Sequence, residues 1–151
     1  MGAFAAREEY PILLVKKNEI PESINKAFKE LGIKNVYLAG GVNTVSEKVA
    51  KDLPGLIERI AGENRFETAV KIAKEKFAGR ESIFLANGHV FADALVISPV
   101  AGLLDMPILL TNADTAPKSL TEYIEEENIK AITAVGGQRM VSDKVLEELT
   151  K

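Results

Sequence analysis

Residues 82–88, Ser-Ile-Phe-Leu-Ala-Asn-Gly, carry the clearest structural signal in this chain. The run from Ile83 to Ala86 is apolar throughout, has the length of a strand and ends at the turn pair Asn87-Gly88. Strands that are apolar on both faces are typical of parallel sheets covered by helices on each side. Residues 108–110 and 131–135 have the same character, and segments with helical spacing separate them.

Helical segments complete this pattern. Apolar residues at helical spacing between Phe66 and Phe77 predict a surface helix that ends near Gly79, with Asn64 and Glu67 forming a capping box at its start. Ser46 and Ser142 have the character of helix N-caps. Residues 12–15 and 36–39 predict two further strands, each followed by a helix. The sequence therefore predicts an α/β fold of about six βα units, with a parallel sheet and helices on both faces. Periodicity does not decide between one doubly wound sheet and a separate lobe for the half unit, and we favour one compact body.

An internal duplication organises the chain. Pro11-Ile12-Leu13-Leu14 returns as Pro107-Ile108-Leu109-Leu110, and Gly40-Gly41 returns as Gly136-Gly137, both at an offset of 96 residues. No gap is needed to keep this offset over residues 11–55. We therefore expect residues 1–55 to be the second half of a preceding repeat and residues 56–151 to be one complete repeat.

Composition excludes several classes of protein. The net charge of −3 provides no basic field for nucleic acid or an anionic membrane surface. The absence of cysteine excludes zinc fingers, thiol nucleophiles and disulfides, and His89 is the single histidine. We expect neither a cofactor nor a metal. The start of the chain lacks the pattern of a secretion signal, although a signal could lie upstream in a longer parent.

Ligands of open parallel sheets bind beyond the carboxyl ends of the strands. Four pairs of residues follow predicted strands here, namely Gly40-Gly41, Asn87-Gly88, Thr111-Asn112 and Gly136-Gly137. Each diglycine allows backbone N–H groups to approach an anion closely, but it also suits a simple turn between strand and helix. Arg59, Arg65, Lys71 and Arg80 provide a possible anion contact, or only a solvated surface.

Asp93 is the anomalous residue of the segment 91–104, which is apolar on every face and predicts a buried helix too short to cross a membrane. A buried carboxylate needs a partner, and the candidates are Arg59 or Arg65, Asn87 and His89. Asp93 and His89 could form an acid–base or metal pair. The favoured interpretation is that Asp93 is a structural ion pair or a helix anchor.

Several motifs occur together in order: the string from Arg59 to Ala69, Asn87-Gly88-x-x-Phe91-Ala92-Asp93-Ala94-Leu95, Ser98-Pro99, Pro107 to Thr111, and Gly136-Gly137. This order resembles the cell wall-binding repeat type 2 family across residues 59–151, with residues 4–55 resembling the latter half of a repeat. Phe66 stands where the family usually has tyrosine, and Asn64 where it usually has aspartate.

The resemblance implies a non-catalytic module, carried in tandem on bacterial surface proteins, that holds them non-covalently to an anionic polymer of the Gram-positive cell wall. It implies toprim-like units in a pseudo-threefold arrangement, with the Pro-Ile-Leu-Leu segment near the polymer. An extracellular location at the cell wall follows, with neighbouring repeats or further copies of the chain as partners. The candidate polymer-binding residues are Arg65, Asn87, Pro107, Ile108, Leu109, Leu110, Thr111, Asn112, Gly136, Gly137, Gly40 and Gly41.

Two other functions remain open at this point. The Gly-Gly turns and Asp93 are compatible with an α/β enzyme that binds phosphate or a nucleotide. A purely structural oligomerisation module is the second alternative, because repeats need neighbours to cover their apolar faces.

Overall fold

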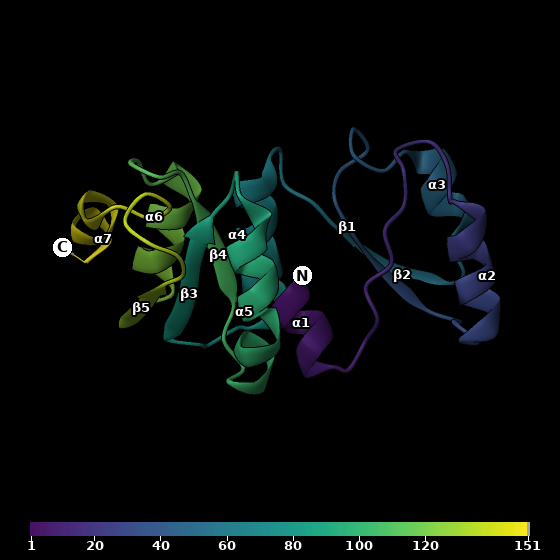
Figure 1. Cartoon of the computed structure of the whole chain (residues 1–151), viewed down its shortest axis with the longest axis horizontal. Helices are drawn as coiled ribbons and strands as arrows, with labels where there is room; N and C mark the ends of the chain where they lie inside the picture. The colour runs from purple at the N-terminus through teal and green to yellow at the C-terminus, as the bar shows by residue number, and fades with distance from the viewer. Residues whose placement is uncertain (151) are drawn as a thin grey trace.

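The structure is a computed structural model that describes residues 1–150 (Figure 1). Its elements in chain order are α1 (Gly2–Arg7), α2 (Glu22–Glu30), β1 (Val36–Ala39), α3 (Glu47–Asp52), β2 (Leu56–Ile60), α4 (Arg65–Lys76), β3 (Ser82–Asn87), α5 (Phe91–Leu103), β4 (Ile108–Thr111), α6 (Lys118–Glu126), β5 (Ala131–Ala134) and α7 (Asp143–Leu149).

Strands and helices alternate, and every strand pair is parallel, which confirms the predicted α/β class. The strands form two sheets, however: β1 pairs with β2, and β3 lies between β4 and β5. Periodicity left open whether all strands share one sheet, and the structure has two sheets, although one cluster of buried residues that includes Ile60 and Phe84 joins them. About six βα units were expected, and the sheets within residues 1–150 contain five strands: residues 12–15 run as coil, and β2 is a strand that the sequence analysis did not identify.

Figure 1 shows the two sheets in separate lobes, with α1 and α5 between them. The first lobe contains β1, β2, α2 and α3, and the second contains the remaining strands with α4, α6 and α7. Strand β2 follows the expected repeat boundary after residue 55, yet it completes the sheet of the first lobe. The boundary between the sequence repeats and the boundary between the lobes therefore differ by one strand, because β2 follows the first boundary but belongs to the first lobe.

Helix caps hold the ends of the elements as predicted. The Asn64 side chain accepts hydrogen bonds from the backbone N–H groups of Phe66 and Glu67, at 2.9 and 3.0 Å. Ser46 and Ser142 cap α3 and α7, each accepting from the N–H three residues later. These bonds satisfy N–H groups that have no partner within their helices.

Helix α5 departs from expectation. The sequence predicted a helix buried on all sides, but Phe91, Val96 and Leu103 are 78%, 78% and 88% exposed. Only one side of α5 is covered, where α1 and strands β3 and β4 pack against it and bury Ala101 and Gly102. An apolar helix is fully buried only where enough neighbours are present, and here one face has none within residues 1–150.

The contact between α1 and α5 joins residues that are equivalent in the repeat. Gly2 lies against Ser98, and Ala6 lies against Gly102, so both pairs keep the offset of 96 residues. Helix α1 is therefore the counterpart of the second half of α5, and the two helices pack in parallel at the same height. Equivalent helical segments of the two repeat parts thus pack against each other between the lobes.

Candidate functional site

Strands β3 and β4 bring four predicted residues together at their carboxyl ends. Asn87 and Thr111 are paired in register across the two strands, and both are buried. Gly88 follows Asn87, and Asn112 follows Thr111, so the predicted strand-end positions form one edge. We call the set Arg65, Asn87, His89, Thr111, Asn112 and Gly137 the strand-end site.

Asn87 organises the loops around this site. Its side-chain N–H donates to the carbonyl oxygen of Met140 at 2.8 Å, and its side-chain oxygen accepts from the backbone N–H of His89 at 2.8 Å. Both ends of the amide are therefore used inside the protein. Asn87 positions the loop after β3 against the loop after β5, and its burial keeps the rest of the amide away from a ligand.

The exposed His89 and the half-buried Asn112 form the outer part of the site. The Nε2 atom of His89 lies 2.9 Å from the side-chain oxygen of Asn112, and the amide nitrogen of Asn112 donates to the Thr115 carbonyl at 3.2 Å. The Phe66 ring meets the His89 ring edge-on, with centroids 5.8 Å apart. Sequence reasoning missed the roles of Thr115 and Met140, because neither residue belongs to a recognisable motif.

Arg65 is the cation of this edge. It is exposed, and its Nη1 atom donates to the carbonyl oxygen of Gly88 at 2.7 Å. A guanidinium carries five N–H donors, so most of this group remains available to an anion. That single bond directs the side chain toward the loop after β3.

The other basic residues of the predicted anion contact lie elsewhere and are used in the fold. Arg59 donates to the carbonyl oxygens of Gly40 and Val45, both at 2.8 Å. Lys71 donates to the Ala61 carbonyl, and Arg80 pairs with Asp105. The four cations are therefore not gathered into one cluster.

The two diglycines occupy different lobes. Gly136 has a φ of +100°, and a Cβ there would lie 2.5 Å from an Asp93 carboxylate oxygen, so glycine is required by both backbone and space. Nothing lies within 4 Å of the corresponding position on Gly137, which is exposed in the loop after β5. Gly40 has a φ of +121°, and its loop is held by Arg59.

Asp93 lies in the first turn of α5, half-buried, with its carboxylate against Gly136. Within residues 1–150, no hydrogen bond or ion pair joins it to His89, Arg59 or Arg65. A carboxylate in the first turn interacts favourably with the helix dipole. Its position therefore fits the helix-anchor interpretation.

The Pro-Ile-Leu-Leu segments differ between the two repeat parts. Pro107 and Leu109 are fully buried, and Ile108 and Leu110 are half-buried, so these side chains belong mainly to the core of the second lobe. The equivalent segment, residues 11–14, is largely exposed. In the full repeat, the polar edge after this segment is what solvent can reach.

Two kinds of feature are absent from the described residues. Residues 1–150 contain no group of three or more His, Cys, Asp or Glu side chains placed to hold a metal ion. The helices in the same range include none that is both long and apolar enough to cross a membrane.

Comparison with known proteins gives a consistent result. The family model for cell wall binding domain 2 matches residues 1–50 and 59–146. The N-acetylmuramoyl-L-alanine amidase LytC of Bacillus subtilis is 32% identical over 148 residues, which is 96% of this chain and 30% of that protein. The chain thus spans less than a third of this relative, and the likeness carries no amidase activity over to it.

Two solved structures have the same fold. Cwp6 from Clostridium difficile superposes with a TM-score of 0.84 at 31% identity, covering 99% of this chain and 24% of that one. Cwp8 from Clostridium difficile superposes with a TM-score of 0.77 at 30% identity, covering 98% and 26%. The fold, the repeat and the family model agree on one assignment. The chain belongs to the cell wall binding domain 2 family, and it is a cell wall binding module of the bacterial cell surface.

Proposed function

We propose that this module anchors a larger surface protein non-covalently to an anionic cell-wall polymer, and that the strand-end site is its contact. The observation that carries the proposal is the exposed guanidinium of Arg65, directed by its bond to Gly88 and placed beside a polar edge. The module is acidic overall, so an anionic polymer must be bound at a discrete cationic point of this kind.

The candidate residues divide into two roles in this proposal. Arg65, Asn112 and the N–H of Gly137 contact the polymer, because they lie at the surface. Asn87, Thr111 and the segment from Pro107 to Leu110 position that edge from within the fold, and the exposed Gly136 shapes the loop after β5. The Gly40-Gly41 loop provides a second, separate contact in the first lobe.

Neighbouring repeats are the second proposed partner. The parallel packing of α1 on α5 through equivalent residues supports association of repeats around a common axis. The face of α5 that stays exposed then receives the equivalent helix of another repeat or of a second chain. Several weak polymer contacts are thereby linked in one assembly, and linkage raises the overall affinity by avidity.

A wall pull-down tests the polymer proposal. Purified Gram-positive walls are used before and after hydrofluoric acid removes phosphodiester-linked polymer, and the retained chain is measured. We expect retention on untreated walls and its loss on extracted walls. Equal retention on both, or on neither when a multi-repeat parent is also assayed, would contradict a polymer partner.

Arg65→Gln tests the site within this assay. The variant removes one charge from the strand-end site, and we expect retention to fall by about tenfold, corresponding to about 1.4 kcal/mol for a charge-assisted contact. Lys118→Gln is the matched control, because it removes one charge from an exposed position on α6. Equal losses in the two variants would show that only net charge matters.

A further inference from the structure

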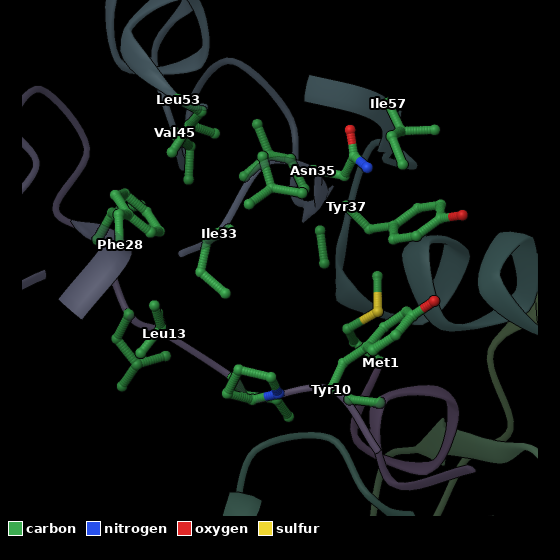
Figure 2. A pocket seen from close by; sticks show the side chains of 18 of the residues that line it. Met1, Tyr10, Leu13, Phe28, Ile33, Asn35, Tyr37, Val45, Leu53 and Ile57 are labelled. Carbon is green, nitrogen blue, oxygen red and sulfur yellow. The ribbon is translucent and has the colours of Figure 1, made fainter. Parts of the chain in front are cut away.

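The first lobe contains a cavity of about 710 Å³ between residues 10–15 and strand β1. Figure 2 shows Leu13 and Phe28 on one side of this cavity, with Tyr37 on the other. Ile33 and Leu53 also contribute to the lining, which is mostly apolar. The cavity lies apart from the strand-end site of the second lobe.

The repeat identifies what corresponds to this space in the other lobe. The offset of 96 residues places residues 12–15 at β4 and β1 at the position of β5. In the complete repeat, β3 lies between β4 and β5 and pairs with both. The cavity therefore occupies the position that β3, the central strand, has in the second lobe.

The segment before the cavity starts where β4 starts. The backbone N–H of Tyr10 donates to the Ala5 carbonyl at 2.8 Å. The equivalent bond, from Met106 to Ala101, is 2.9 Å long. Each bond joins the beginning of the extended segment to the helix that precedes it.

The same segment also ends where β4 ends. The N–H of Ser46 donates to the Lys17 carbonyl at 2.8 Å, and the equivalent N–H of Ser142 donates to Ala113 at 2.9 Å. Both ends of residues 10–17 are thus held as in the complete repeat. Residues 10–17 on one side of the cavity are therefore held at both ends as in the second lobe, although no strand lies between them and β1.

The exposed edge of β1 carries unused hydrogen-bonding groups. Val36 and Gly40 donate to Gly55 and Ile60 on the β2 side. Because N–H groups alternate along a strand, those of Tyr37 and Ala39 point to the opposite side, toward the cavity. In the complete repeat, the equivalent of Ala39 is Val135, which donates to Leu85 of β3 at 2.8 Å.

We propose that this cavity is an acceptor for an apolar β-strand with the chemistry of β3, supplied by the first half of a repeat of this family. The strand enters parallel to β1, and its counterpart of Phe84 lies between Ile12 and Tyr37, the register seen in the second lobe. Only an extended peptide fits both sides, because it meets the N–H groups of β1 and buries Leu13 at the same time.

A synthetic peptide with the sequence of residues 81–88, Glu-Ser-Ile-Phe-Leu-Ala-Asn-Gly, tests this proposal on the full chain. We expect the amides of Tyr37 and Ala39 to exchange about tenfold more slowly with the peptide bound, since they gain hydrogen bonds. The thermal midpoint should rise with peptide concentration, because binding stabilises the folded state. A peptide with Pro in place of Leu85 is the matched control, since it lacks the N–H and interrupts pairing.

Joining the peptide covalently to the chain ensures that weak affinity of the free peptide cannot explain a lack of protection. The same peptide is joined to the N-terminus through a flexible Gly/Ser linker, which raises its effective concentration to about the millimolar range. Protection of Tyr37 and Ala39 that is lost in Leu13→Asp supports the proposal. Absence of protection in both forms, equal action of the Pro peptide, or protection confined to the edges of β4 and β5 would overturn it.

Discussion

Asp105 connects three segments through its two carboxylate oxygens. One oxygen accepts from Arg7 of α1 at 2.8 Å, and the other accepts from Nε of Arg80 at 2.7 Å. Burial acts to raise the pKa of Asp105, but the hydrogen bonds and charges of Arg7 and Arg80 outweigh it, and the pKa is lowered from its usual value. The ionised form of Asp105 therefore stabilises the attachment of α1.

Asp105→Asn should lower the free energy of unfolding at pH 7 by about 1 kcal/mol, a modest value because solvent reaches the pair. A lowered pKa stabilises the fold above the unfolded-state value of about 3.9, and this contribution is lost as the pH falls through the folded-state pKa. Urea unfolding at pH 7 and at pH 3 measures the effect, and the difference between the two proteins should be smaller at the lower pH. A constant difference would show that the charge is not responsible.

Local residue roles were predictable, and long-range ones were not. The caps at Asn64, Ser46 and Ser142 follow from neighbouring sequence, and the structure confirms them. The partner of Asn87 is Met140, which lies 53 positions later, and no local pattern indicates it. For Asp93, the sequence indicated that the carboxylate needs a partner, but not that it would lie against Gly136.

Gly102 controls the packing of two elements. A Cβ at this position would lie 2.7 Å from the Ala6 Cβ and 2.8 Å from the Arg7 backbone nitrogen. Backbone cannot yield as a flexible side chain can, so Gly102→Leu should force α1 away from α5 and cost about 2–3 kcal/mol. Thermal unfolding measures the loss, and amide exchange in α1 should increase selectively. Val96→Ala, on the exposed face of α5, should change stability by less than about 0.5 kcal/mol.

Element type was predictable where each element has its partners. Strands β3, β4 and β5 and helix α4 lie where the apolar patterns indicated, whereas β2 was not predicted. Residues 12–15 have the composition of β4 but form no strand, because the neighbour that would supply hydrogen bonds is absent from the lobe. The burial of α5 was overestimated for a related reason, since its sequence describes a helix with more neighbours than α1 provides.

At the scale of the whole molecule, the repeat was the most informative feature of the sequence. It revealed the duplicated segments, and the ordered motifs gave the family resemblance, which the family model confirms. It did not predict that β2 would complete the sheet of the first lobe, because strand pairing depends on chain direction in space rather than on periodicity. The pairing of β1 with β2 gives the first lobe a sheet of its own.

The exposed face of α5 leads us to predict that the chain associates with itself. Its large apolar residues with substantial exposure are Phe91, Leu95, Val96, Val100 and Leu103. Adjacent exposed apolar side chains of this kind mark interaction surfaces. Under the proposed packing of equivalent helices, the chain should therefore associate with itself at high concentration. Val96→Glu combined with Leu103→Glu should keep it monomeric, because charges at that interface lose their hydration.

Sedimentation over a range of protein concentrations measures this association directly. Leu31→Glu is the matched control, since Leu31 is 58% exposed but lies in the first lobe, after α2. The control should associate as the unmodified chain does, whereas the double variant should not, with thermal stability nearly unchanged in all three. A wild-type chain that stays monomeric at millimolar concentration would show that the α5 face does not bind a second copy. If Leu31→Glu makes the chain monomeric to the same extent, the contact involves the first lobe instead. The packing of α1 on α5 would then not be a model for how chains associate.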